Sequence, residues 1–199
     1  MSRAPIAFAL LAAGASTRFG APDKLMAPLG GQPLIARAGR RLQARDGIER
    51  LAVVAPQAPA RRSWLASAGW QLIENPHAAH GQGTSVARAA RAARERGARA
   101  LLIALADMPF VSDTTLERLI AAIETHEAAM CQGPEGLMPP AIFSAGLFNR
   151  LEALGGDRGA RTLFDQADSL CRIELAPGEA RDIDTPGDLA ALEKEAAHA

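Results

Sequence analysis

Short apolar runs alternate with longer segments of helical pattern over the first 130 residues, and this alternation restricts the fold more than any other feature. The pattern predicts strands at residues 6–12, 51–55, 70–74 and 100–106. It predicts helices at residues 33–44, 58–68, 83–96 and 113–127. Strands separated by helices of about 10–15 residues are typical of βαβ units. We therefore expect an α/β fold, a three-layer α/β/α sandwich around a mostly parallel sheet.

The pattern is looser after residue 130. Residues 133–140 (GPEGLMPP) predict a loop, residues 141–143 are a candidate strand, and residues 144–154 predict a short helix. Thr185 followed by Pro186 is typical of a helix N-cap with proline at the first helical position, so residues 189–197 are expected to form a closing helix. Because the sequence holds no internal repeat or low-complexity linker, we expect one domain over residues 1–199.

The charge balance excludes some classes of partner. Lys and Arg number 22 and Asp and Glu number 22, whereas a nucleic-acid-binding surface needs a basic excess. The sequence has no run of 18 apolar residues, so we expect no membrane span. Cys131 and Cys171 lack the spacing of a zinc site and are expected to be buried thiols in a reducing, cytoplasmic environment.

The segment of residues 11–25 (LAAGASTRFGAPDKL) follows the first predicted strand, and open α/β sheets bind ligands at the carboxyl ends of their strands. Gly14, Ala15 and Ser16 are small, so their backbone amides could approach a polyphosphate closely. Arg18 and Lys24 add positive charge, and Lys24 is one of only two lysines among the 22 cations. The alternative is a glycine turn with solvated charges, since the segment matches neither G-x-G-x-x-G nor a P-loop.

Acidic residues occupy two further places where a metal ion could be held. Asp107 lies directly after the strand predicted at residues 100–106, where it could hold Mg²⁺ against phosphate oxygens or cap the next turn. Asp182 and Asp184 alternate on a short extended segment, so their side chains are expected to face opposite ways and only one can enter a cleft. On the residues alone, the favoured interpretation is that both aspartates are exposed and that residues 185–188 only start a helix.

Two glycine-containing segments are candidates for further ligand contacts. In residues 75–85 (NPHAAHGQGTS), Gly81 and Gly83 allow close backbone approach, and Thr84 and Ser85 can hydrogen-bond a base, ribose or phosphate. The alternative is that these residues only cap the next helix. In residues 155–161 (GGDRGAR), Asp157 is expected to cap a helix that starts near Arg158. That helix start, with Arg158 and Arg161, forms either an anion site or a plain cap with solvated arginines.

The segment of residues 11–25 resembles the signature loop of the MobA-like nucleotidyltransferases, whose pattern is roughly L-A-A/G-G-x-S-x-R-M/F-G-x-x-K-L. The matching residues are Leu11, Ala12, Ala13, Gly14, Ser16, Arg18, Phe19, Gly20, Lys24 and Leu25. The resemblance implies a Rossmann-like nucleotidyltransferase fold and a loop that wraps the triphosphate of a nucleotide, with Arg18 and Lys24 as catalytic cations. It also implies that Asp107, in a D-x-P motif, and the late Asp184, in D-I-D-T-P-x-D-L, bind Mg²⁺. Asp182 is the weaker candidate for the second ligand.

The resemblance also implies nucleotide contacts from the loop and from the segment of residues 75–85. The residues assigned to the nucleotide are Leu11, Ala12, Ala13, Gly14, Ala15, Ser16, Lys24, Asn75, Gly83, Thr84 and Ser85.

The later part of the chain is similar to the molybdenum cofactor cytidylyltransferase branch of this family. The similarity rests on Pro140, Phe143, Gly156, Asp157, Gly159, Ala160 and Arg161, and on the L-A-A-G form of the loop. It implies transfer of CMP from CTP to the terminal phosphate of molybdenum-bound molybdopterin, with Asp157 and Arg161 binding the acceptor. The alternatives are a relative that uses GTP or another phosphorylated acceptor, and a non-catalytic cofactor carrier. The Arg/Ala-rich residues 83–96 are either a solvated face or a docking surface for a molybdoenzyme or its maturation chaperone.

Overall fold

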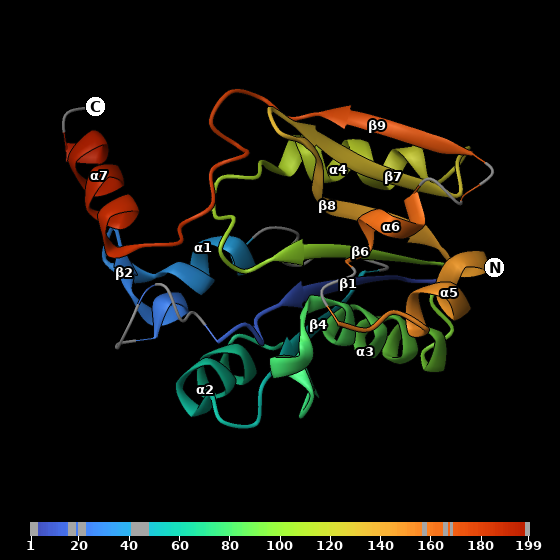
Figure 1. Ribbon diagram of the computed structural model, residues 1–199, viewed down its shortest axis with the longest axis horizontal. Coiled ribbons are helices and arrows are strands. Elements are labelled where there is room, and N and C mark those ends of the chain that lie inside the picture. The colour runs from blue at the N-terminus through green and yellow to red at the C-terminus, as the bar shows by residue number, and fades with distance from the viewer. Residues whose placement is uncertain are drawn as a thin grey trace.

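A seven-stranded sheet forms the centre of the molecule, with strand order β5-β4-β1-β6-β8-β7-β9 (Figure 1). The computed structural model describes residues 4–15, 19, 23–40, 48–156, 159–164, 167 and 169–197. The strands are β1 (Ile6–Leu11), β4 (Ile48–Val54), β5 (Gln71–Glu74), β6 (Ala100–Leu105), β7 (Ala128–Gly133), β8 (Gly136–Ser144) and β9 (Leu170–Glu174). β8 runs antiparallel to its neighbours β6 and β7, and the other pairings of this sheet within the described chain are parallel.

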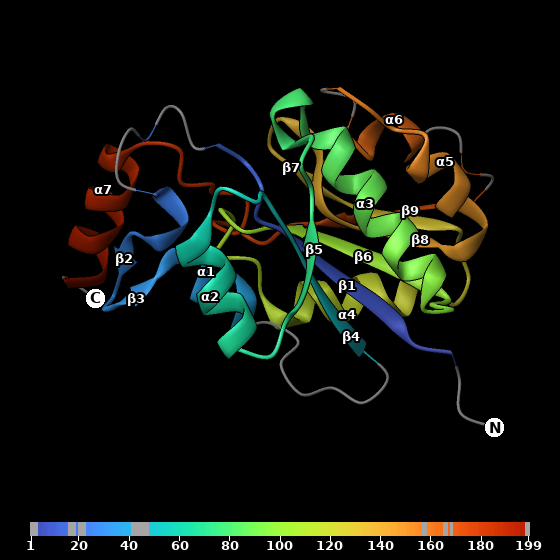
Figure 2. The same ribbon diagram turned by 90° about the horizontal axis from the view of Figure 1, so that it is seen from below.

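Helices cover both faces of the sheet. They are α1 (Leu34–Arg40), α2 (Pro59–Ser67), α3 (Gln82–Glu95), α4 (Asp113–Ala122), α5 (Phe148–Glu152), α6 (Arg161–Phe164) and α7 (Pro186–Ala197). Figure 2 shows α3, α5 and α6 on one side of the sheet and α1 and α4 on the other. Short 3₁₀ turns are η1 (Lys24–Met26), η2 (Ala78–His80) and η3 (Ala145–Leu147), and β2 (Pro28–Leu29) pairs with β3 (Gln32–Pro33). The predicted three-layer α/β/α fold with a mostly parallel sheet is confirmed.

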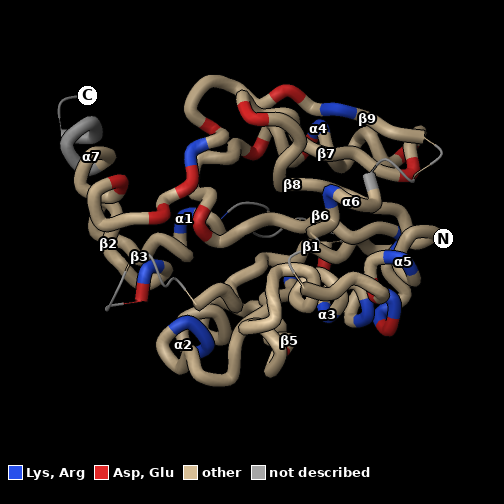
Figure 3. Tube along the Cα trace, viewed as in Figure 1, with Lys and Arg blue, Asp and Glu red and all other residues tan. Residues whose placement is uncertain are grey.

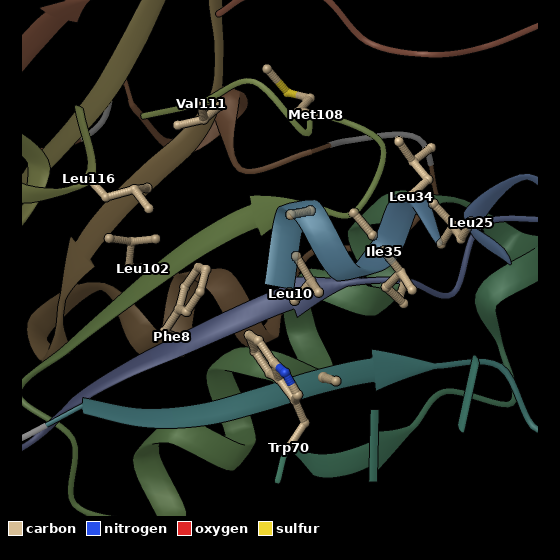
Figure 4. Close-up of a cluster of buried hydrophobic side chains, with 14 of the residues drawn as sticks. Phe8, Leu10, Leu25, Leu34, Ile35, Trp70, Leu102, Met108, Val111 and Leu116 are labelled. Atoms are coloured by element: carbon tan, nitrogen blue, oxygen red, sulfur yellow. The ribbon is translucent and has the colours of Figure 1, made fainter. Parts of the chain in front are cut away.

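β1 separates two apolar cores because its side chains alternate between the two faces of the sheet. Phe8 and Leu10 point toward α1 and α4, where Figure 4 shows them beside Leu34, Ile35 and Leu116. On the opposite face, Ala7 and Ala9 belong to a core that includes Ala89, Ala90 and Ala93 of α3. The small alanine side chains on both surfaces let this helix lie close against the sheet. All six residues of β1 are buried, which explains its uninterrupted apolar sequence.

The strand register brings the ends of β1, β4 and β6 to one edge of the sheet. Leu11, the last residue of β1, lies opposite Val53 of β4 and Leu105 of β6. The chain stays paired for one more residue, since Ala106 N donates to Leu11 O at 3.1 Å. The loop that follows β1 and the acid that follows β6 therefore begin side by side.

The prediction of a loop at residues 133–140 is wrong. These residues belong to a β-hairpin of β7 and β8, whose turn passes through Gly136 at φ 115°. The prolines suggested a loop, but the pairing skips them: Met130 lies opposite Ala141, and Cys131 lies opposite Met138. A register shift at this point leaves Pro139 and Pro140 outside the ladder, where their missing N–H groups cost no hydrogen bond.

Two helix predictions need smaller corrections. The helix expected to start near Arg158 begins at Arg161 and has four residues. Asp157 and Arg158, the predicted cap and the first predicted cation of the anion site, lie outside the described part of the chain. The helix predicted over 113–127 ends at Ala122. Its start is as predicted, because the Ser112 side chain accepts a hydrogen bond from Thr115 N.

Neither the distribution of charge nor the two cysteines of the described chain indicates a particular class of partner. Figure 3 shows lysine and arginine interspersed with aspartate and glutamate along the described chain. No helix in the described ranges combines the length and apolarity that a bilayer crossing requires. Cys131 and Cys171 are free cysteines; Cys131 is buried as predicted, whereas Cys171 on β9 is only partly buried. Burial raises the pKa of the Cys131 thiol to about 12. Cys131 is therefore a neutral, inert core residue at ordinary pH.

Candidate active site

A cavity of about 480 Å³ opens at the edge of the sheet where β1 and β6 end. Small residues of the loop after β1 form one wall, and the turn before α3 forms another. Lys24, Asp107 and Asp184 provide the charged part of the lining. The lining residues described are Leu11, Ala13, Gly14, Ala15, Lys24, Leu25, Ala78, Ala79, Gly81, Gln82, Ser85, Leu105, Ala106, Asp107 and Asp184. A cavity of this size at the carboxyl ends of parallel strands suits a nucleotide-sized ligand.

The Lys24 ammonium lies between two carboxylates that are distant in sequence. Its Nζ donates to Asp107 Oδ2 at 2.8 Å and to Asp184 Oδ1 at 3.0 Å. The lysine side chain is 7% exposed, while the two carboxylates are partly open to the cavity. Three segments, after β1, after β6 and before α7, thus meet at one point.

The two carboxylates keep Lys24 charged despite its burial. Burial alone would lower the pKa of Lys24, but the charges and hydrogen bonds of Asp107 and Asp184 outweigh it and raise the pKa above its usual value. Lys24 is therefore a fixed cation at neutral pH. With one lysine between two acids, the cluster carries a net negative charge that favours a further cation.

Glu179 fixes the segment that brings Asp184 to the cavity. It is buried against the N-terminus of α4, where it accepts hydrogen bonds from Ser112 N at 2.7 Å and Thr115 Oγ1 at 2.8 Å. It also accepts from Ala176 N at 2.9 Å within its own segment. An acid at a helix N-terminus is favoured by the helix dipole. Burial alone would raise the pKa of Glu179, but these hydrogen bonds outweigh it and lower the pKa.

The segment is fixed a second time close to the acids. Ile183 N donates to Asp107 O at 3.2 Å, so the backbone next to Asp184 is hydrogen-bonded to the backbone of the other acid. Asp188 then accepts from Asp184 N and Thr185 N, and its own amide donates to Thr185 Oγ1, which starts α7 at Pro186. The predicted N-cap at Thr185 is confirmed by this reciprocal pair.

Comparison with known proteins assigns the chain to a family. The model of the MobA-like NTP transferase domain matches residues 8–170. The chain belongs to the MobA-like NTP transferase family. It is 32% identical over 188 residues to the purine catabolism protein PucB of Bacillus subtilis (strain 168), which covers 88% of this chain and 90% of PucB.

Solved structures agree on the fold of this family member. Rv0371c from Mycobacterium tuberculosis H37Rv superposes with a TM-score of 0.79 at 24% identity, covering 98% of this chain and 100% of that one. The molybdopterin-guanine dinucleotide biosynthesis protein A of Archaeoglobus fulgidus gives a TM-score of 0.69 at 20% identity, covering 97% and 100%. These likenesses show the fold, and the match to the family model makes the chain a nucleotidyltransferase of the MobA-like family.

The structure brings together part of the nucleotide-binding set that the sequence predicts for this MobA-like protein. Among the residues described, Leu11, Ala13, Gly14, Ala15, Lys24 and Ser85 line the cavity. Ser16 and Arg18 lie outside the described residues. Ala12 is buried and turns its carbonyl toward Arg61 of α2, behind the loop.

Asn75, Thr84 and Gly83 hold the turn before α3 together instead of facing the cavity. The Asn75 amide nitrogen donates to Thr84 Oγ1 and Ser85 Oγ, each at 2.9 Å, and its oxygen accepts from His77 N. Gly83 N donates to Gly156 O at 2.9 Å. The cavity wall itself includes Gly81, for which the sequence predicts close backbone approach, and three residues that sequence reasoning did not assign, Ala78, Ala79 and Gln82. Gly81, at φ 106°, was the available signal, because only glycine readily adopts this conformation.

The segment predicted to bind the acceptor lies against this wall. A methyl group added at Gly159 would lie 3.1 Å from Gln82 Oε1, and Gln82 lines the cavity. Arg161 is exposed and approaches the β7–β8 turn: a methyl group added at Gly136 would lie 3.4 Å from its Nη2. Asp157 lies outside the described residues.

The donor set of the acidic cluster fits a hard divalent cation. Asp107 and Asp184 direct one carboxylate oxygen each at the same ammonium, so the fold already brings two oxygens to a single cation. The described residues contain no group of three or more His, Cys, Asp or Glu suited to a metal ion. Two carboxylates, completed by substrate phosphates and water, are a usual arrangement for Mg²⁺ or Mn²⁺.

Replacing Glu179 by glutamine is expected to lower stability by about 1–3 kcal/mol at pH 7, because a buried charged acceptor is lost. The folded-state pKa of Glu179 is lowered, so its contribution is present above its ordinary value of 4.5 and is lost as the pH falls below it. Urea unfolding should therefore show a gap between wild type and Glu179→Gln at pH 7 that narrows below about pH 4.5.

Glu174→Gln, on an exposed position of β9, is the matched control and should unfold like the wild type at both pH values. A Glu179→Gln protein that is as stable as the control at pH 7 would contradict the anchoring role.

Proposed function

We propose that this MobA-like nucleotidyltransferase transfers CMP from CTP to the terminal phosphate of molybdenum-bound molybdopterin and releases pyrophosphate. The observation that carries the proposal is that Lys24 lies between Asp107 and Asp184 in the same cavity that the loop after β1 lines. A site for a nucleoside triphosphate needs cations for its phosphates and carboxylates for a metal ion, and the cavity holds both.

In the proposed reaction the protein aligns the two substrates and neutralises the charge of their phosphates. An oxygen of the acceptor phosphate attacks the α-phosphorus, the bond from that phosphorus to the bridging oxygen breaks, and pyrophosphate leaves with the electron pair. No covalent intermediate with the protein is required, since alignment and charge neutralisation supply most of the acceleration in phosphoryl transfer. Lys24 and the loop at Gly14 hold the phosphates in line, and Lys24 stabilises charge on the leaving group.

Asp107 and Asp184 are the proposed ligands of Mg²⁺. A divalent cation held by these residues supplies neutralisation of the phosphate oxygens when the nucleotide is bound. A structural relative, Rv0371c, is described in a complex with manganese, which supports a divalent cation in a site of this fold. In the absence of that cation, Lys24 offsets the charge of both acids and so keeps two carboxylates close together without strong repulsion.

The walls of the cavity suggest where the base and the acceptor lie. Ser85 and Gln82, with the backbone at Gly81, provide hydrogen-bonding groups next to the loop, which suits the base and ribose. Residues 155–161 pack against the same wall through Gly159, which suits an acceptor approaching from that side. The similarity of this segment to the cytidylyltransferase branch supports CTP and the molybdenum cofactor. Delivery of the product to a molybdoenzyme or its maturation chaperone would follow.

A second candidate uses GTP with a related acceptor. One structural relative is named for molybdopterin-guanine dinucleotide biosynthesis, which supports a guanine nucleotide. The sequence relative PucB is named for purine catabolism and favours neither base. A carrier that holds finished cofactor without turnover is the third candidate, and the combination of Lys24, Asp107 and Asp184 weighs against it.

Pyrophosphate release should separate these candidates. Purified protein is supplied with CTP, GTP, ATP or UTP and Mg²⁺, with and without molybdenum-loaded molybdopterin. We expect release with CTP that depends on both the acceptor and the metal. If GTP is the only one of the four nucleotides that supports release, the donor is GTP and the proposal of CTP is wrong. Tight binding of a cofactor dinucleotide without release from any nucleotide would overturn the enzyme in favour of a carrier.

Asp184→Asn is expected to lower kcat strongly, whereas Asp182→Asn should change it little. Asp184 accepts a hydrogen bond from Lys24, whereas Asp182 is an exposed residue. Desolvation of the Asp182 carboxyl and the charges of Asp184 and Asp107 raise the pKa of Asp182. Both variants are compared at saturating and limiting Mg²⁺. If Asp182→Asn needs more Mg²⁺ for activity while Asp184→Asn behaves like the wild type, then Asp182 and not Asp184 is the metal ligand.

Lys24→Met is expected to have two opposite effects. It should lower kcat by roughly 10²–10³, the scale for one donor to a developing charge. It should also tighten Mn²⁺ binding in the absence of nucleotide, because both carboxylates lose the ammonium to which they are hydrogen-bonded. Steady-state kinetics and a Mn²⁺ titration measure these effects, with Lys194→Met on α7 as the control. Near-normal turnover in Lys24→Met would exclude its proposed role.

A further inference from the structure

Arg61 of α2 is buried beneath the loop that follows β1. Its Nη1 donates to Ala12 O at 2.8 Å and to Gly14 O at 2.7 Å, and its Nε donates to Asp23 Oδ2 at 2.6 Å. The side chain is 5% exposed and is not part of the cavity lining. A buried guanidinium is costly unless its donors are paired, so this position is specified by its contacts with the loop.

The carbonyls that Arg61 holds determine where the neighbouring amides point. In a trans peptide the C=O and the following N–H point in opposite directions. Because the carbonyls of Ala12 and Gly14 face Arg61, the amides of Ala13 and Ala15 face away from it. Ala13 and Ala15 line the cavity, whereas Arg61 lies on the other side of the loop. The two N–H groups are therefore directed at the cavity.

These two amides are available to a ligand. Neither Ala13 N nor Ala15 N donates a hydrogen bond to any residue within the described part of the chain. Backbone donors usually have a partner when they lie beside a packed loop. Two amides that have no acceptor among the described residues, at alternate positions of the loop, form a small site for oxygen acceptors. Phosphate or carbonyl oxygens of a nucleotide are suitable acceptors.

The same guanidinium also controls the other end of the loop. Asp23, which Arg61 binds through Oδ2, accepts Leu25 N at its Oδ1 at 3.0 Å and so caps the η1 turn. This turn carries Lys24, whose ammonium contacts Asp107 and Asp184. One arginine thus links the amides at the start of the loop to the lysine at its end. The planar fork of arginine can make these contacts together, and a lysine cannot.

We propose that Arg61 is a positioning residue for nucleotide binding. It orients the amides of Ala13 and Ala15 as donors to oxygen atoms of a nucleoside triphosphate, and it sets Lys24 through Asp23. The inference rests on the proposed function only in that the ligand is a nucleoside triphosphate. It does not depend on the base or on the acceptor.

Arg61→Lys tests the proposal, with Arg62→Lys as the matched control. Arg62 is the next residue of α2 and pairs with Glu74 instead of the loop. Binding of CTP and of GTP is measured by titration calorimetry with Mg²⁺ present. Arg61→Lys should weaken nucleotide binding roughly tenfold to a hundredfold, the effect of losing charge-assisted hydrogen bonds. Arg62→Lys should bind like the wild type.

The kinetic and spectroscopic readouts separate positioning from a general structural defect. The KM for the nucleotide should rise in Arg61→Lys while the KM for the acceptor stays unchanged. In ¹⁵N spectra of the wild type, nucleotide should shift the amides of Ala13 and Ala15, and in Arg61→Lys these shifts should shrink. Thermal unfolding confirms that each variant is folded. If Arg61→Lys does not fold, Asp23→Asn keeps the η1 cap and should still weaken nucleotide binding several-fold.

Arg61→Lys or Asp23→Asn protein that folds and binds nucleotide as tightly as the wild type would overturn the inference. Nucleotide that binds the wild type without shifting the two amides would overturn it as well. Wild type that binds no nucleotide would overturn both this inference and the proposed function. Wild type that binds nucleotide through these amides but transfers nothing to any acceptor overturns only the proposed function.

Discussion

The contact of Lys24 with Asp107 and Asp184 depends on three parts of the fold, the ends of β1 and β6 and the segment before α7. Each of the three residues lies on a different segment, and they converge only if β1 and β6 end at the same edge and the chain returns there before α7. The lysine is also what allows the two acids to stay close, because like charges at short range would otherwise separate or take up a proton. The charges that hold this cluster together are thus the same ones that the proposed reaction would use.

The parts of the molecule that do not touch the cavity act by placing those that do. Glu179 fixes the returning segment to the N-terminus of α4, and Arg61 fixes the loop from behind. Asn75 hydrogen-bonds within the turn before α3, and the small residues Ala78, Ala79 and Gly81 of that turn line the cavity. A site formed largely from backbone and small residues leaves room for a nucleotide and gives it rigid hydrogen-bonding partners.

Sequence reasoning was most successful where a strong local pattern met an elementary constraint. The fully apolar β1 and β6 were predictable because both faces of a central parallel strand are buried. It failed where tertiary pairing overrode a local signal, as in β8, whose prolines fall at a register shift. Arg61 was missed for a related reason. In sequence it is one arginine among 20, and only its burial against two carbonyls distinguishes it.

The sequence alone determined the alternation of strands and helices, the small-residue loop after the first strand and the presence of a lysine and acids of the right kind, because these depend on side-chain type and on spacing along the chain. The tertiary structure decided that Asp184 rather than Asp182 contacts Lys24, and that the alanines and Gly81 rather than Asn75 face the cavity. These choices depend on strand register and on the path of the returning chain. Both are set by contacts between residues distant in sequence, which no local pattern encodes.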